Sequence, residues 1–109
     1  MGYSVIPTEK FKKEANRLIK KYPSLKEELY KLETTLSTDP KSGIDLGQNT
    51  YKIRLAIKSK GKGKMGGGRV ITYVFTKDKE VYLLTIFDKS EFDTIDNKMI
   101  KSIVENLKK

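Results

Sequence analysis

Cysteine and histidine are both absent from the 109-residue sequence. Without cysteine the chain has no disulfide, no thiolate nucleophile and no cysteine-based metal site. Without histidine it lacks the commonest general base of enzymes, the Ser-His-Asp triad and most zinc chemistry. Any catalysis must therefore use Lys, Arg, Tyr, Asp, Glu, Ser or Thr side chains, and we expect no metal and no other cofactor.

Long hydrophobic runs are also absent, because no stretch approaches the ~18 apolar residues of a membrane span. The N-terminus lacks the hydrophobic segment of a signal peptide. Hydrophobic residues make up 37% of the chain, which is enough for one core between two layers. We therefore expect a soluble, cytoplasmic protein with a single domain over residues 1–109 and no membrane partner.

Acidic residues are missing from the middle of the chain. The formal net charge is +9, from 23 basic and 14 acidic residues, and the 32 residues at 46–77 contain no acid. The basic residues of this segment are Lys52, Arg54, Lys58, Lys60, Lys62, Lys64, Arg69 and Lys77. Such a segment concentrates positive potential and attracts polyanions. A role in solubility is the alternative, but a surface for nucleic acid or phosphate is the better interpretation.

The first third of the chain predicts two helices. Apolar residues recur with helical spacing at 11–22 and again at 25–36, and a proline separates the two stretches. Thr8 is expected to cap the first helix, and Ser24 with Glu27 to form a capping box for the second. A three-residue link between two such helices predicts an antiparallel helical hairpin.

The remaining periodic stretches predict a sheet and one more helix. Residues 51–58 alternate between apolar and mostly basic side chains, as in a half-buried strand with its charges on an exposed face. The stretches 70–75 and 81–87 are apolar on both faces, which is typical of central strands. An apolar stripe predicts a third helix at about 93–108. With a short edge strand at 3–6, these elements predict an α+β fold: the helical hairpin and the C-terminal helix pack on one face of a small, mainly antiparallel sheet of three to four strands.

Two segments are expected to be loops. The first runs from residue 39 to about 50, after an Asp-Pro pair that ends the second helix. The second, at 61–68, contains Gly61, Gly63 and Gly66 with the spacing of dinucleotide-binding motifs. A dinucleotide-binding motif must be followed by a helix, whereas here a strand-like stretch follows, so we reject that interpretation. We interpret the segment as a hairpin loop whose lysines and backbone amides can approach phosphates closely.

The sequence resembles the RelE/HigB-type toxins of bacterial type II toxin–antitoxin modules, which belong to the RelE/ParE superfamily. The features that carry this resemblance are the helical hairpin, the Gly-Lys-Gly-Lys loop and the segments 51–54, 69–73 and 83–91. The resemblance covers nearly the whole chain. It implies a small basic endoribonuclease that enters the ribosomal A site, cleaves messenger RNA and is neutralised by a cognate antitoxin. Antitoxins of this kind often bind their own operator, so DNA is expected as an indirect partner only.

The resemblance assigns the catalytic work to Lys52, Arg54, Arg69, Lys89 and Glu91. Arginine grips phosphate oxygens with a planar fork and stays protonated, so Arg54 and Arg69 suit stabilisation of the phosphorane. A lysine serves as a base only when its pKa falls well below ~10.4, and crowding by like charges acts in that direction, which favours Lys52 beside Arg54. Glu91 is the alternative base, and Lys89 can neutralise the leaving oxygen.

Further RNA contacts are expected from Lys58, Lys60, Lys62 and Lys64. Tyr73 either stacks on a base or belongs to the core. Several members of the family carry a Tyr or His near the start of the last helix, whereas the stretch 92–96 has neither. Without histidine the protein should be a poor free ribonuclease, so we expect the ribosome to supply the orientation of the RNA. The alternatives are a non-catalytic member that binds RNA, the ribosome or DNA gyrase, and a plain basic ribosome-associated domain.

Overall fold

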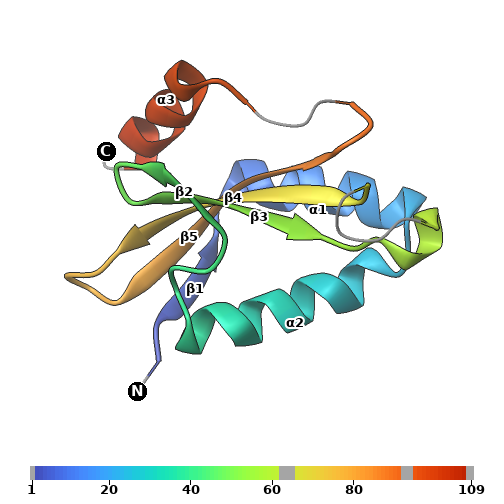
Figure 1. Ribbon diagram of the computed structural model, residues 1–109, viewed down its shortest axis with the longest axis horizontal. Coiled ribbons are helices and arrows are strands. Elements are labelled where there is room, and N and C mark those ends of the chain that lie inside the picture. The colour runs from blue at the N-terminus through green and yellow to red at the C-terminus, as the bar shows by residue number, and fades with distance from the viewer. Residues whose placement is uncertain (1, 62–65, 92–94, 108–109) are drawn as a thin grey trace.

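The computed structural model describes residues 2–61, 66–91 and 95–107, and in this part of the chain three helices lie on the two faces of a five-stranded sheet (Figure 1). The strands are β1 (Ser4–Pro7), β2 (Ile44–Gly47), β3 (Thr50–Leu55), β4 (Gly68–Phe75) and β5 (Glu80–Asp88). The helices are α1 (Glu9–Lys21), α2 (Leu25–Thr38) and α3 (Asn97–Leu107), and a 3₁₀ turn covers Lys58–Lys60. The strand order is β1-β5-β4-β3-β2; β1 and β5 are parallel and the other neighbours antiparallel, which confirms the predicted α+β class.

The two helices α1 and α2 cover one face of the sheet and bury the predicted apolar stripes. The buried residues of these helices are Phe11, Ala15, Leu18, Leu25, Leu29, Leu32 and Leu36. The hydroxyl of Thr8 accepts a hydrogen bond from the backbone N–H of Phe11 at 3.2 Å, so it caps α1 as predicted. The same hydroxyl donates to the carbonyl oxygen of Leu83 at 2.9 Å, which ties the start of α1 to β5.

The turn between α1 and α2 differs from the prediction at Ser24. Its side chain forms no cap hydrogen bond with α2, so the expected capping box is wrong. Instead, its hydroxyl accepts from the backbone N–H of Ser59 at 2.8 Å, and the hydroxyl of Ser59 accepts from the N–H of Ser24 at 2.9 Å. These reciprocal bonds attach the helical hairpin to the 3₁₀ turn that follows β3.

The third helix, α3, packs on the opposite face of the sheet, whereas the sequence prediction placed all helices on one face. It covers a second core cluster that includes Ile71, Tyr73, Leu84 and Phe87, with Ile100 buried against them. Central strands that are apolar on both faces require a cover on each side, and α3 supplies the second cover. The carboxylate of Asp96 accepts from the backbone N–H of Met99 at 2.9 Å and caps α3. The predicted start near residue 93 lies outside the described residues.

Strand β2 occupies part of the segment 39–50, which was predicted to be a loop, so the sheet has five strands instead of the predicted three to four. It pairs with β3 through a two-residue turn in which Gln48 and Asn49 have φ of 52° and 66°. Positive φ at both central residues is the requirement of a type I′ hairpin turn. The pairing ends at Lys52, so beyond it β3 has a strand neighbour on the β4 side alone within the described residues.

No helix within the described ranges is long and apolar enough to cross a membrane.

Candidate functional site

Three of the predicted site residues lie on one face of the sheet, which we call the basic row: Lys52, Arg54 and Arg69. Arg54 of β3 pairs directly with Arg69 of β4, and Arg69 pairs with Phe87 of β5. Lys52 is two residues from Arg54 along β3 and therefore shares its face. Side chains of directly paired residues start only ~4.5–5.5 Å apart at Cβ, so the two arginines crowd like charges together. An anion placed against them relieves that repulsion.

The members of the basic row differ in exposure. Arg54 is exposed and Lys52 half-buried, whereas Arg69 is only 2% exposed. The Nη1 of Arg69 donates to the carbonyl oxygen of Gly68 at 3.0 Å. A phosphate on this face therefore meets Arg54 and Lys52 first, with the charge of Arg69 beneath them.

The two remaining catalytic candidates follow β5, and the structure separates them. The backbone N–H of Lys89 donates to the carbonyl oxygen of Gly67 at 3.0 Å, which keeps Lys89 beside the start of β4 and hence near Arg69. Glu91 instead lies within 3.6 Å of Arg17 on α1. Because α1 covers the face opposite to the basic row, this contact draws the carboxylate of Glu91 away from Lys52.

The predicted RNA-binding lysines have different environments. Lys58 is exposed, and Lys60 is half-buried with its ammonium engaged inside the protein. Lys62 and Lys64 lie outside the described residues.

The ring of Tyr73 is in the second core and is 8% exposed. It stacks on Phe75 at 6.5 Å between ring centroids and lies 6.4 Å from the ring of Tyr82. Its neighbours in this cluster include the side chain of Leu107 of α3. The structure therefore favours the core role over base stacking for Tyr73.

A buried polar network at Asp88, the last residue of β5, was not anticipated from the sequence. Asp88 is 1% exposed, forms an ion pair with Lys60 and accepts from the hydroxyl of Tyr22 at 2.9 Å. It also accepts from the backbone N–H and the hydroxyl of Ser90, each at 2.9 Å. Burial raises the pKa of the Asp88 carboxyl, but the hydrogen bonds from Lys60, Ser90 and Tyr22 outweigh burial and hold its pKa well below the usual range.

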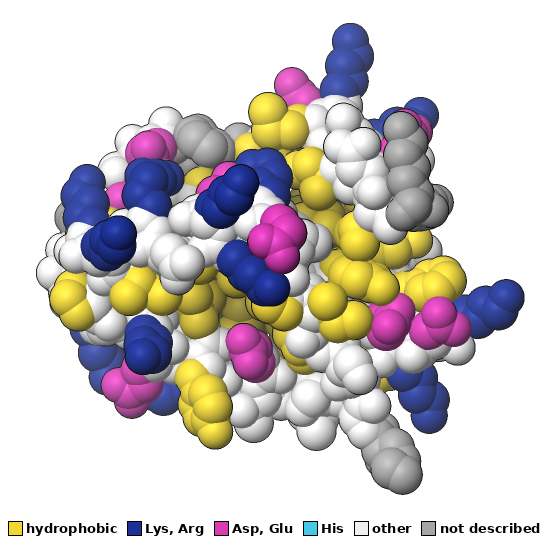
Figure 2. All heavy atoms as spheres, turned by 180° about the vertical axis from the view of Figure 1, so that it is seen from behind, with side chains coloured by type: hydrophobic (Ala, Val, Ile, Leu, Met, Phe, Trp, Pro, Cys, Tyr) yellow, Lys and Arg dark blue, Asp and Glu magenta, His cyan; other side chains and the backbone are white. Residues whose placement is uncertain are grey.

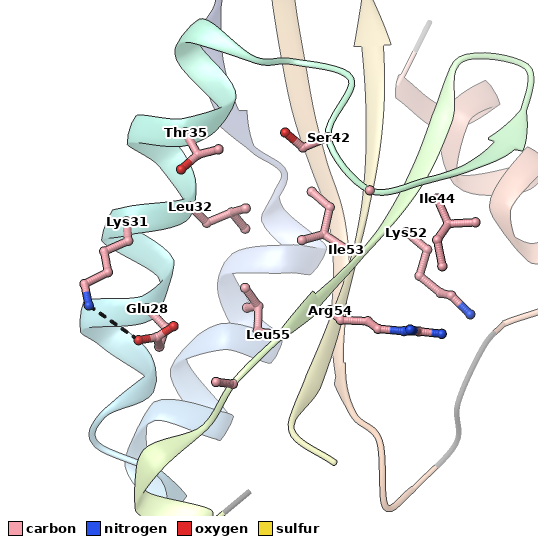
Figure 3. Close-up of a pocket in the computed structure, with 12 residues that line it drawn as sticks. Glu28, Lys31, Leu32, Thr35, Ser42, Ile44, Lys52, Ile53, Arg54 and Leu55 are labelled. Atoms are coloured by element: carbon pink, nitrogen blue, oxygen red, sulfur yellow. Dashed lines mark ion pairs between the residues drawn. The ribbon is translucent and has the colours of Figure 1, made fainter. Parts of the chain in front are cut away.

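A groove of about 460 Å³ lies on the other side of β3, between this strand and α2 (Figure 3). Its lining includes Leu32 of α2 together with Ile53 and Leu55, which point toward α2, whereas Lys52 and Arg54 point away from it. The groove runs along the part of β3 that has no β2 neighbour. Its apolar floor suits a protein segment better than a polyanion.

Charges of both signs are mixed elsewhere on the surface. Figure 2 shows the face behind that of Figure 1, where Lys and Arg side chains alternate with Asp and Glu around exposed apolar side chains. On α1, for example, Lys10 lies 2.5 Å from Glu14 and Lys12 lies 3.4 Å from Glu9. Such mixed charges produce little net electrostatic potential, which distinguishes this surface from the acid-free segment 46–77.

Comparison with known proteins identifies the fold. No family model matches the chain. Among solved structures, it is similar to the Escherichia coli toxin RelE, in a double arginine-to-alanine mutant in the free state, with a TM-score of 0.65 and 17% sequence identity. The match covers 97% of this chain and 98% of the RelE chain. The protein therefore has the RelE toxin fold over nearly its full length, as the resemblance in the sequence predicted.

Proposed function

We propose that this protein is the toxin of a type II toxin–antitoxin module and acts in the cytoplasm as a ribosome-dependent endoribonuclease that cleaves messenger RNA at the A site and inhibits translation. The observation that carries this proposal is the basic row: on a RelE fold, Arg54 lies directly opposite Arg69, with Lys52 on the same face. Arg54 and Lys52 can bind a single phosphodiester, because they lie two residues apart on one strand face, with the charge of the buried Arg69 beneath them.

The proposed reaction is attack of a 2′-hydroxyl on the adjacent phosphorus. The oxygen–phosphorus bond to the 2′-oxygen forms while the bond to the 5′-oxygen breaks, which leaves a 2′,3′-cyclic phosphate and a 5′-hydroxyl end. Lys52, in its neutral form, accepts the proton of the 2′-hydroxyl, and Lys89 donates a proton to the leaving oxygen. Arg54 binds the non-bridging oxygens, with Arg69 as the second charge, and loss of one such donor typically costs ~10²–10³-fold in rate.

The position of Glu91 favours Lys52 as the base. The carboxylate of Glu91 lies 3.6 Å from Arg17 of α1, and α1 covers the face of the sheet opposite to the basic row. Glu91 is therefore a poor alternative general base. Proton transfer by one side chain contributes ~10²–10⁴-fold, whereas orientation of the reacting groups can contribute more. We therefore expect cleavage to depend on the ribosome, which holds the message in place.

An antitoxin is the proposed protein partner. It must cover or compete for the exposed cations of the acid-free segment 46–77, such as Arg54 and Lys58, which favours acidic side chains on its toxin-binding part. The apolar groove between α2 and β3 gives it a hydrophobic surface close to the basic row. DNA is proposed as a partner only through the antitoxin.

The test is mapping of message ends in a reconstituted translation reaction. The wild-type protein should produce cuts at A-site codons, and the same message without ribosomes should stay largely intact. The matched variants are Arg54→Ala and Lys77→Ala, which remove one charge each from the acid-free segment 46–77. Lys77 is the control because it is exposed in the turn between β4 and β5, at the end of the sheet away from the basic row. Arg54→Ala should lose cleavage and Lys77→Ala should keep it.

Two results would contradict the proposal. Intact messages together with stalled DNA gyrase indicate a non-catalytic toxin of the same fold. Intact messages and normal growth on expression indicate a basic domain without toxin activity.

A further inference from the structure

The ion pair between Lys60 and Asp88 links four segments at the end of the sheet that carries Arg54 and Arg69. Asp88 ends β5 and is in register with Gly68 of β4, one position from the Arg69–Phe87 pair. The ammonium of Lys60 contacts its carboxylate and donates to the carbonyl oxygen of Gly66 at 3.0 Å. Lys60 therefore connects the two described ends of the loop between β3 and β4.

The same carboxylate connects the loop to α1 and to the turn after β5. Tyr22, at the C-terminal end of α1, donates its hydroxyl to Asp88, and its ring lies 6.0 Å from the ammonium of Lys60. Ser90 donates both its N–H and its hydroxyl to Asp88. The turn fixed in this way contains Lys89, the proposed proton donor.

We infer that Lys60 is a positioning residue and not an RNA contact: bound to Asp88 and to the carbonyl oxygen of Gly66, it holds the chain before β4 and the turn with Lys89 in place beside the basic row. Its side chain is 13% exposed and its ammonium has two protein acceptors, a carboxylate oxygen and a carbonyl oxygen. A lysine that binds a phosphate must instead leave its ammonium open to the ligand. The neighbouring Lys58 is exposed and its ammonium has no partner among the described residues, so it is the natural phosphate contact of this turn.

The inference rests in part on the proposed function, and one readout is independent of it. Amide hydrogen exchange reports directly on the turn: the N–H of Ser90 is bonded to the Asp88 carboxylate and that of Lys89 to Gly67. In Lys60→Ala, exchange at Ser90 and Lys89 should rise ~10- to 100-fold, the equivalent of losing one charge-assisted hydrogen bond. Exchange at the N–H of Val74, bonded to Asn49 at the other end of the sheet, should rise less than exchange at Ser90 and Lys89. Lys58→Ala, the matched control, should leave all three amides unchanged.

Binding of RNA separates the two roles of Lys60. The probe is a single-stranded RNA oligonucleotide with methylated 2′-hydroxyls, which cannot be cleaved, titrated at several salt concentrations. A positioning role predicts an unchanged slope of log affinity against log salt in Lys60→Ala, while Lys58→Ala lowers the slope by about 0.7, the value for one phosphate contact on single strands. With cleavable message on the ribosome, Lys60→Ala should lower kcat and leave KM near the wild-type value.

The variant Asp88→Asn gives opposite results for the two roles. If Lys60 positions the turn, Asp88→Asn resembles Lys60→Ala in amide exchange and in kcat. If Lys60 binds RNA, Asp88→Asn frees its ammonium and tightens binding of the oligonucleotide, which overturns the inference. A lower salt slope in Lys60→Ala, or unchanged exchange at Ser90, also overturns it.

A milder variant keeps the test usable if both substitutions prevent folding. Tyr22→Phe removes one hydrogen bond to Asp88 and leaves the ion pair intact, so exchange at Ser90 should rise by a smaller factor, with unchanged RNA affinity. Unchanged exchange in this variant counts against the inference. Failure of the oligonucleotide to bind wild-type protein, with the exchange results as expected, contradicts the proposed function and leaves the positioning role in place.

Discussion

The substitution Asp88→Asn tests the buried network through stability. The amide keeps the shape of the side chain but removes its charge, so the ammonium of Lys60 stays half-buried without a counter-charge. Removal of one partner from a buried pair costs ~3–5 kcal/mol of folding free energy. Because the Lys60 side chain is 13% exposed and retains the Gly66 carbonyl, we expect the lower end, about 3 kcal/mol. At ~4 °C per kcal/mol, the midpoint of thermal unfolding falls by about 12 °C.

The pH dependence of this difference follows from the lowered pKa of Asp88 in the folded protein. A carboxyl with a lowered pKa contributes stability at pH above its unfolded value of ~3.9, and this contribution is lost as pH falls toward the folded value. Urea unfolding should therefore give a constant difference between wild type and Asp88→Asn from pH 7 to about pH 5, and a shrinking difference below.

A matched control and a clear refutation complete this test. Asp78→Asn removes the same charge from the exposed turn between β4 and β5, and its stability should stay within about 0.5 kcal/mol of wild type at every pH. The reasoning is refuted if Asp88→Asn is as stable as this control at pH 7. It is also refuted if the difference between the two variants persists undiminished to pH 2.

Four further substitutions probe the fold by urea unfolding. Gly43→Ala should cost ~1–3 kcal/mol or more of folding free energy, because φ is 101° and the new Cβ would lie 2.5 Å from a carbonyl oxygen of β3. Gly47→Ala should cost less, because its φ is 90° but the space around it is open. Equal costs of the two substitutions would contradict the steric account. Ile100→Ala should cost ~2–4 kcal/mol, since this α3 side chain is 6% exposed against the second core, and a cost below 1 kcal/mol would mean that α3 contributes little. Arg17→Ala removes an exposed ion pair and should cost less than ~0.5 kcal/mol, so a larger loss would show that this pair is structural.

The elements with a clear period were predictable from the sequence. The alternation at 51–58 identified β3 and the face of Lys52 and Arg54, although the strand ends at Leu55 and Lys58 begins a 3₁₀ turn. Leucines at helical spacing identified α2. These predictions succeed because burial of one face or one stripe imposes its period on the sequence. The side of the sheet that α3 occupies was missed, although two central strands without a polar face already require cover on both sides.

Features that depend on contacts distant in sequence were not predictable. The β2–β3 hairpin turn uses Gln48 at positive φ, where glycine or asparagine is the usual signal. Within the site, the sequence identified the basic residues of β3 and β4 but not the burial of Arg69, which depends on the packing around β4. Lys60, which forms the ion pair with Asp88, is 28 residues away from it in the chain. In the sequence, the buried network was indicated only by an acidic residue at the end of an apolar strand.

The measurement that tests the central claim most directly is the salt dependence of binding between the uncleavable RNA oligonucleotide and the basic row. Arg54→Ala should weaken binding and lower the slope of log affinity against log salt by about 0.7, while Lys77→Ala, at the far end of the sheet, should leave the slope of the wild type. Equal slopes for wild type and Arg54→Ala, or an equal loss in both variants, would mean that Arg54 of the basic row does not hold the phosphodiester.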